Sequence, residues 1–243
     1  MTSHNLSEIY RLNQRGGRPL SLLDLVAANT LDLSVAAFLA GAVAGGATLL
    51  TAARPGNAGK TTLLAAALAF VPPHRPIVAV GHPGVLEKAP RRCCLLAHEI
   101  GDGPYYGYLW GKEARRFFQM ADGERSAVSC IHADTLEELH AILCGNAIGL
   151  PEEAFRRIDV VAFLRLDRTL RGYRRRVSAV YAVDPGSGRH RRAYVWDDTS
   201  DTYFAENPPA CWEKWVERAR GVLGELVAQG ETEFEQVYAR AQT

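Results

Sequence analysis

A glycine-containing turn after a short apolar run is the stretch of the chain best suited to chemistry. Residues 47–70 read as a buried strand, a turn, and a helix that begins at Gly59-Lys60-Thr61-Thr62. In such a turn, successive backbone N–H groups and a helix N-terminus converge on one point, which suits phosphate oxygens. Lys60 would contact the β- and γ-phosphates of a nucleotide, and the Thr61 hydroxyl would hold Mg²⁺. The stretch therefore predicts a phosphate-binding loop.

The predicted loop departs from the usual pattern at one position. The motif G-x-x-x-x-G-K-[ST] requires its first glycine at position 54, where this chain has Arg54. A Gly-Lys-Thr helix start without a ligand is the alternative, because such tripeptides are common. The apolar strand before the loop and the helix-forming run after it favour phosphate binding. The predicted nucleotide-binding residues are Pro55, Gly56, Asn57, Ala58, Gly59, Lys60, Thr61 and Thr62.

The composition limits the class of protein. The 243 residues suffice for one large or two small domains, and a net charge of +1 gives no sign of a nucleic-acid-binding surface. The five cysteines form no CxxC pair and no Cys/His ligand spacing. Their odd number and the lack of a visible signal peptide predict a reducing, cytoplasmic compartment. The apolar stretch 33–53 is interrupted by Gly45-Gly46, so we expect a helix, a turn and a buried strand there and a soluble protein.

The rest of the chain alternates apolar strands with helices. Strands are expected over 77–80, 93–97 and 127–131, and the helix over 136–146 is expected to be capped by Asp134. The last third reads as antiparallel strands followed by two amphipathic helices, with the basic run 168–176 as a solvated turn. This pattern predicts an α/β fold with a largely parallel sheet.

Several segments, in this order, resemble the secretion ATPases of type II and type IV secretion, type IV pilus and archaellum systems. The family's phosphate loop, helix, Pro-Pro break and next strand resemble RPGNAGKTTLLAAALAFVPPHRPIVAV (54–80), and its His box resembles SAVSCIHADTLEEL (126–139). The strands that follow resemble RIDVVAFLRL, RRRVSAVYAV and AYVWDDTSDTYF, and the terminal helices resemble ELVAQGETEFEQVYARA. The shared order of these segments, over roughly 21–243, carries the resemblance.

The resemblance implies a RecA-like P-loop motor domain that uses ATP and Mg²⁺. It divides the chain into an N-terminal linker (1–20), the motor domain (21–200) and C-terminal helices (201–243). It also implies a hexameric ring, peripheral to the membrane at most, at the cytoplasmic face of a secretion or pilus machine with inner-membrane platform proteins. Lys60 would contact phosphates, Thr61 would hold Mg²⁺, and His132 would sense the γ-phosphate. A histidine satisfied by local backbone groups is the alternative for His132.

The catalytic carboxylate is where the chain departs most from the family. Gly81-His82 stand where the family has Glu-Asp, and spacing from His132 puts Tyr108 at the Walker B glutamate. A phenol with a pKa near 10 cannot act as a base at neutral pH. The remaining candidates are Glu99, which follows an apolar strand, and Glu113, in a stretch that still matches the Walker B pattern. An ordinary surface glutamate is the alternative for Glu99.

These observations leave three functional hypotheses. The first is a secretion-type ATPase that couples nucleotide binding and hydrolysis to protein translocation or pilus assembly. The second is a degenerate subunit that binds nucleotide, hydrolyses it slowly and acts structurally or in regulation, since the arginines of the family's N-terminal domain are missing. The third is a small-molecule phosphotransferase. The lack of a recognisable Arg-rich lid segment in the sequence argues against it.

Overall fold

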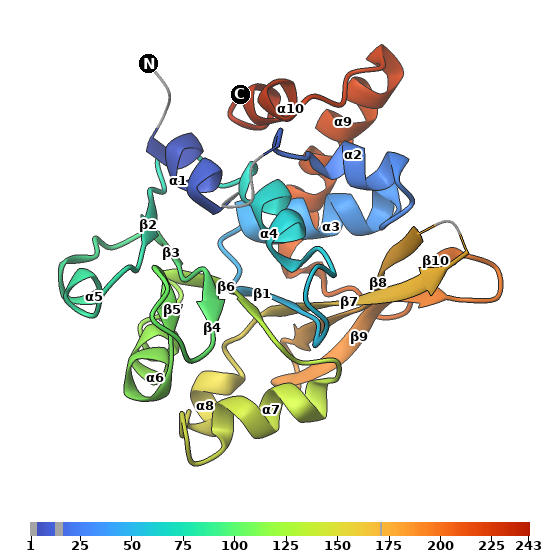
Figure 1. Ribbon diagram of the computed structural model, residues 1–243. Helices are drawn as coiled ribbons and strands as arrows, with labels where there is room; N and C mark the ends of the chain where they lie inside the picture. Colours follow the sequence, from blue (N-terminus) through green and yellow to red (C-terminus); the bar gives the residue numbers. More distant parts are fainter. Residues whose placement is uncertain (1–3, 13–16, 171) are drawn as a thin grey trace.

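A mixed sheet forms the centre of the molecule in the computed structural model, which describes residues 4–12, 17–170 and 172–243 (Figure 1). Its strand order is β10-β9-β8-β7-β1-β6-β3-β2, with β4 beside β6 and β5 beside β4. The strands are β1 (Leu49–Ala52), β2 (Ile77–Ala79), β3 (Cys94–Leu96), β4 (Glu99–Ile100), β5 (Tyr108–Leu109), β6 (Ser126–Ile131), β7 (Val160–Thr169), β8 (Gly172–Asp184), β9 (Arg189–Asp197) and β10 (Thr202–Ala205).

The sheet is parallel in one half and antiparallel in the other. Strands β7, β1, β6, β3 and β2 run parallel, whereas β8, β9 and β10 continue the sheet as an antiparallel meander. Parallel strands are covered on both faces, which explains why β1, β3 and β6 read as continuous apolar runs. The fold class expected from the sequence is confirmed.

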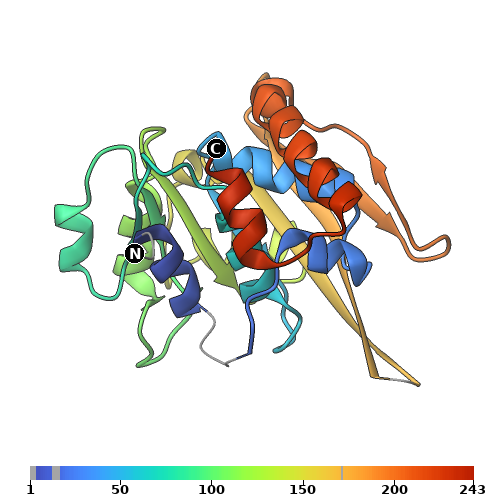
Figure 2. The same cartoon turned by 90° about the horizontal axis from the view of Figure 1, so that it is seen from above.

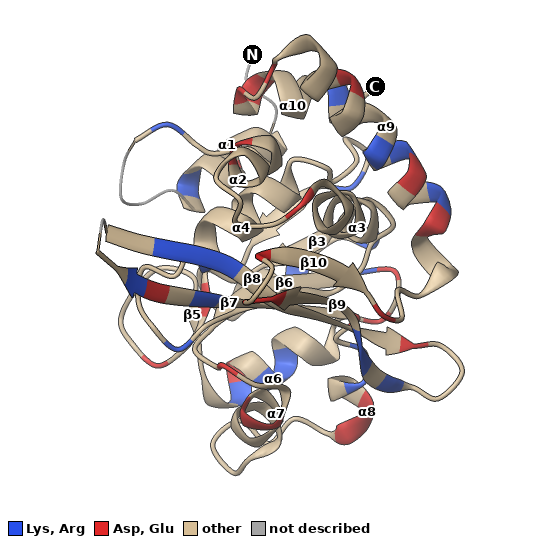
Figure 3. Ribbon diagram, turned by 90° about the vertical axis from the view of Figure 1, so that its right-hand side faces the viewer, with Lys and Arg blue, Asp and Glu red and all other residues tan. Residues whose placement is uncertain are grey.

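Two layers of helices cover the sheet (Figure 1, Figure 3). Helices α1 to α4, α9 and α10 lie on one face, and α6, α7 and α8 lie on the other. The helices are α1 (His4–Leu12), α2 (Leu22–Ala27), α3 (Leu33–Ala44), α4 (Lys60–Leu68), α5 (Gly84–Lys88), α6 (Gly111–Gln119), α7 (Leu136–Cys144), α8 (Glu152–Phe155), the 3₁₀ turn η1 (Ala210–Trp212), α9 (Glu213–Gln229) and α10 (Phe234–Ala241).

Both ends of the described chain pack on the same core as the phosphate-loop helix (Figure 2). Residues 4–12 of the predicted linker form α1, which buries Ile9 and Leu12, and the Asn5 side chain accepts a hydrogen bond from the Ile77 backbone N–H at 2.8 Å. At the other end α9 lies against α3, where a Cβ on Gly41 would come within 2.5 Å of the Val216 backbone. The expected boundaries at 20 and 200 remain predictions.

Helix α7 begins differently from what the sequence suggests. Its N-cap is Thr135, whose hydroxyl accepts a hydrogen bond from the Glu138 backbone N–H at 3.1 Å, so the expectation that Asp134 caps this helix is wrong. The Asp134 carboxylate instead accepts the Arg54 backbone N–H at 2.7 Å. Asp134 and Thr135 can both cap a helix. Asp134 binds the Arg54 backbone in the predicted phosphate loop, and Thr135 caps α7.

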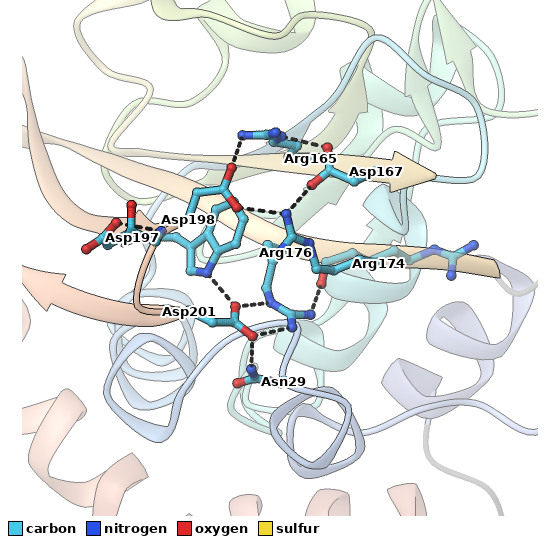
Figure 4. A network of polar contacts seen from close by, with 11 residues as sticks. Asn29, Arg165, Asp167, Arg174, Arg176, Asp197, Asp198 and Asp201 are labelled. Carbon is cyan, nitrogen blue, oxygen red and sulfur yellow. Dashed lines mark hydrogen bonds and ion pairs between the residues drawn. The ribbon is translucent and has the colours of Figure 1, made fainter. Parts of the chain in front are cut away.

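The β7–β8 hairpin extends beyond the helical layers (Figure 2). The basic run expected to be a solvated turn lies mostly within its two strands. Arg176 binds Asp201 through Nε at 2.7 Å, and the Arg174 guanidinium binds Asp167 and Asp198 (Figure 4). The guanidinium carbons of Arg165, Arg174 and Arg176 lie 5.6, 4.9 and 6.0 Å from the Trp196 ring centroid. Acidic residues of the β9–β10 turn thus hold the arginines of the hairpin around one indole ring.

None of the helices in the described segments is both long enough and apolar enough to span a membrane. The most apolar of them, α3, is 12 residues long and lies in the core against α9.

Candidate phosphate-binding site

Three strand ends far apart in the sequence converge at one edge of the sheet. Strand β1 leads into the predicted phosphate loop, β6 into His132, and β3 into His98-Glu99. The strands are parallel and β6 lies between the other two, so their carboxyl ends meet. Ligands of open α/β sheets bind outside this edge.

The phosphate loop presents its backbone to solvent. Pro55, Gly56 and Asn57 are exposed, while Ala58 is buried and anchors the loop in the core. Asn57 and Gly59 adopt left-handed conformations, with φ of 65° and 99°, and Gly59 is the N-cap of α4. Among the described side chains none caps this helix, so its first N–H groups remain available to an anion.

Lys60 points back toward the ends of the parallel strands. Its side chain is 7% exposed, and its Nζ donates a hydrogen bond to the Ala53 carbonyl oxygen at 3.2 Å. The same nitrogen lies 3.4 Å from both ring nitrogens of His132 and 3.8 Å from Glu99 Oε1. Lys60 therefore faces both a histidine and a carboxylate.

Glu99 is a buried acid that begins β4, three residues after the end of β3. Its side chain is 9% exposed, and Oε1 makes no hydrogen bond to the described part of the chain, although Lys60 and His132 lie within ion-pair distance. Burial raises the pKa of this carboxyl group, while the charges of Lys60 and His132 partly offset the rise. The interpretation of Glu99 as an ordinary surface residue is not supported, because the side chain is enclosed beside the phosphate loop.

His132 connects the acid to the entry of the loop. Its Nδ1 lies 2.7 Å from the Arg54 carbonyl oxygen, and its Nε2 lies 3.5 Å from Glu99 Oε1. The backbone group that it contacts belongs to a residue 78 positions away rather than to its own strand end. The ring is half exposed, so it can also face a ligand.

Thr61 and Thr62 lie half-buried in the first turn of α4. The Thr61 hydroxyl oxygen lies 3.8 Å from the Cys130 thiol, and the Thr51 hydroxyl donates to the Lys60 carbonyl oxygen at 3.1 Å. A hydroxyl is an oxygen donor of the kind that Mg²⁺ prefers, so Thr61 fits this ion.

The other acid candidate lies elsewhere. Glu113 is exposed in the first turn of α6, in the helical layer on the opposite face of the sheet from α4. Tyr108, which spacing aligns with the Walker B glutamate, lies in β5 and pairs with Glu99 in the β4–β5 ladder. The structure thus brings Glu99 to Lys60 and leaves Glu113 apart.

Arg54 ties the loop entry to α7. Its backbone N–H binds Asp134, and its guanidinium contacts the Glu138 carboxylate and lies 3.8 Å from Asp134. Glu138 Oε2 in turn accepts the Asp134 backbone N–H at 2.9 Å. The residue that replaces the first glycine of the motif therefore pairs with two acids beside the loop.

One residue of the site was missed in the sequence. Arg175, on β8, donates a hydrogen bond from Nε to the Asn57 carbonyl oxygen at 2.9 Å. Side chains alternate along a strand, so Arg175 faces the loop while its neighbours Arg174 and Arg176 face Trp196. The run of three arginines indicates a basic segment, but the sequence alone does not show which of the three side chains faces the loop.

Comparisons with known proteins gave matches in structure only. No family model and no curated protein sequence matches the chain. It is similar to the VirB11 ATPase from the Brucella suis type IV secretion system, solved in complex with sulphate, with a TM-score of 0.48 and 23% identity over 69% of this chain. It is also similar to the Legionella pneumophila ATPase DotB, with a TM-score of 0.47 and 14% identity over 92% of this chain. The chain spans 56% and 66% of the lengths of these two proteins.

Proposed function

We propose that the chain is the motor domain of a secretion-type ATPase, which binds Mg-ATP at residues 55–62 and hydrolyses it with Glu99 as the catalytic carboxylate. The convergence of Lys60, Glu99 and His132 on one point beside the phosphate loop supports this proposal most strongly. A lysine, a buried acid and a histidine at the carboxyl ends of parallel strands are the groups that phosphoryl transfer requires.

Each side chain has a distinct role in this proposal. Lys60 leaves Glu99 and contacts the β- and γ-phosphates, while Thr61 holds Mg²⁺, which offsets the charge of the transferring phosphoryl group when bound. Glu99, freed from Lys60, orients the attacking water and accepts its proton. Its raised pKa makes it a better base than an ordinary glutamate. His132, in contact with both the loop entry and the acid, responds to the γ-phosphate.

A pair of assays on the same purified sample tests the proposal: calorimetry with Mg-ATP and a phosphate-release measurement. We expect Lys60→Ala to abolish binding, because the loop loses its cation. We expect Glu99→Gln to bind Mg-ATP and to lose turnover, because an amide cannot accept the proton from water. Glu113→Gln is the matched control and should behave as the unchanged chain. Full affinity in Lys60→Ala, or loss of turnover in Glu113→Gln alone, would contradict the assignments.

A degenerate nucleotide-binding subunit is the second candidate function. It is favoured by Arg54 at the loop entry and by Gly81-His82 at the end of β2, where the related ATPases have Glu-Asp. In that case the purified chain binds Mg-ATP and releases phosphate only slowly, and the rate of phosphate release rises when a partner subunit is added.

The assembly of the protein is also part of the proposal. We expect a hexameric ring, as a homo- or hetero-oligomer, at the cytoplasmic face of the inner membrane with secretion or pilus platform proteins. Light scattering with and without Mg-ATP tests the ring, since nucleotide bound between subunits should raise the measured mass. A monomer under both conditions would contradict a homo-oligomeric ring.

A further inference from the structure

Three side chains able to bind a metal lie together where α7 is joined to α8. His140 and Cys144 are one turn apart on α7, and Glu152 is the first residue of α8. One donor atom from each residue, a ring nitrogen, a sulfur and a carboxylate oxygen, lies within 4.8 Å of the other two. Its members are distinct from Lys60, Glu99 and His132, so the cluster is separate from the candidate phosphate-binding site.

We infer that His140, Cys144 and Glu152 bind a zinc-class divalent transition-metal ion, with the remaining coordination position open to water. Imidazole nitrogen, thiolate sulfur and carboxylate oxygen are the three protein donor types of Zn²⁺. Two donors about 2.3 Å from one ion are at most about 4.6 Å apart, so small side-chain movements bring all three onto one ion. A thiolate in the set favours Zn²⁺ over Mg²⁺ or Ca²⁺.

The backbone around the cluster is held firmly. The connection between α7 and α8 is closed by hydrogen bonds from the Gly149 N–H to the Gly145 carbonyl oxygen (2.6 Å) and from the Leu150 N–H to the Leu143 carbonyl oxygen (2.8 Å). Arg115 adds a hydrogen bond from Nε to the Ile148 carbonyl oxygen at 2.6 Å. The ligands are therefore carried by fixed elements, and only their side chains need to adjust.

The surroundings also orient the histidine. The His140 ring packs edge-on against Phe155, with 4.9 Å between centroids, and its Nε2 contacts the Glu152 carboxylate. His140 and Glu152 line a surface pocket together with His190. The Nε2 of His190 lies 2.6 Å from the Ile158 carbonyl oxygen. An ion pair would by itself explain why His140 and Glu152 lie together. A test of Cys144 therefore distinguishes a metal site from a simple ion pair.

Cobalt titration of the full chain tests the inference, because a Co²⁺–thiolate bond gives a near-ultraviolet charge-transfer band. We expect one Co²⁺ per chain with this band, displacement by Zn²⁺, and a rise in melting temperature with Zn²⁺ that a chelator reverses. Cys144→Ser should abolish the band and weaken Zn²⁺ binding roughly 100-fold or more, since even outer-shell changes cost about 10–100-fold. Cys211→Ser, at an exposed cysteine outside the cluster, is the matched control and should keep both.

Two further variants make the outcome decisive. His140→Gln and Glu152→Gln should keep the near-ultraviolet band but bind Co²⁺ more weakly, and all variants should retain the circular dichroism of the unchanged chain. Lys60→Ala should bind the metal normally, which separates this site from the nucleotide proposal. Unchanged Zn²⁺ affinity in Cys144→Ser, or loss of the band in Cys211→Ser, would overturn the inference.

Discussion

At the scale of single residues, the candidate site centres on Lys60, whose Nζ lies 3.8 Å from Glu99 Oε1. In the proposed function, a bound phosphate would compete with Glu99 for this lysine. His132 lies within 3.5 Å of both side chains and contacts the loop entry. His132 is therefore in reach of the loop entry, the lysine and the acid, as the proposed role requires.

Replacing His132 should separate hydrolysis from binding. We expect His132→Asn to lower kcat by about 10²–10³, the usual cost of removing one group that stabilises transition-state charge, because the ring faces both Lys60 and Glu99. The Kd for Mg-ATP should change by less than about threefold, since the loop backbone and Lys60 remain.

Calorimetry and steady-state kinetics on the same preparation measure the two effects. His74→Asn, at an exposed position just after α4, controls for the loss of an imidazole. A large loss of affinity with kcat unchanged would mean that His132 binds nucleotide in the ground state.

At the scale of elements, the antiparallel half of the sheet supports the parallel half that carries the site. The β9–β10 turn binds Arg174 and Arg176 through Asp198 and Asp201 (Figure 4). This sets the rotation of β8 and directs Arg175 toward the loop. A segment that looks like a solvated basic turn is thus a brace between two parts of the sheet.

Removing the contact between β8 and the loop should weaken nucleotide binding. In Arg175→Met the hydrogen bond to the Asn57 carbonyl oxygen is lost while an unbranched side chain remains. A net loss of about 1 kcal/mol corresponds to a roughly fivefold rise in the Kd for Mg-ATP. Arg168→Met, in the same hairpin, should leave the Kd unchanged, and equal effects in both variants would point to net charge as the cause. Calorimetry at two salt concentrations distinguishes these outcomes.

The sequence predicts the elements better than the contacts between them. The apolar runs before the phosphate loop and His132 appear as β1 and β6, because strands buried on both faces leave a continuous apolar signature. Spacing from His132 puts Tyr108 at the position of the Walker B glutamate. A spacing rule contains no information about the short β4–β5 ladder, in which Tyr108 pairs with Glu99. Only the strand order puts the acid beside Lys60.

The cluster of His140, Cys144 and Glu152 also could not be predicted from the sequence. No Cys/His ligand spacing was recognised in the sequence, yet His140 and Cys144 lie one turn apart on α7. Their third companion, Glu152, belongs to another helix, and its approach depends on how the connection from 145 to 151 folds. Pairings across elements of this kind cannot be obtained from local periodicity.

At the scale of the whole molecule, one buried acid couples stability to pH. Asp159 precedes β7 and accepts the Thr48 backbone N–H at 2.8 Å, next to the start of β1. Burial raises the pKa of this carboxyl to about 6. The folded chain therefore holds a proton here that the unfolded chain releases near pH 4, so this group's contribution to stability falls as pH rises from about 4 to about 6.

An amide at this position should remove that dependence. We expect Asp159→Asn to be more stable than the unchanged chain above pH 6, by up to about 3 kcal/mol for a shift of roughly two pKa units. The amide oxygen can still accept the Thr48 N–H. Urea unfolding at pH 4.5 and 7.5 measures the difference, which should shrink at the lower pH. A variant that is less stable at both pH values would mean that the charged carboxylate is favourable in the folded state.

The position of β1 also has a consequence for how the chain reaches its native state. Strand β1 forms ladders with β6 and β7, and Leu49 pairs with Val128 and Val160, which follow 79 and 111 residues later in the chain. During synthesis, the phosphate-loop strand must wait for most of the sheet to emerge, whereas β7, β8 and β9 find partners in their immediate neighbours. Long-range pairings of this kind slow folding. The meander can therefore pair as soon as it is synthesised, whereas the candidate site is completed only when β1 is inserted between β6 and β7.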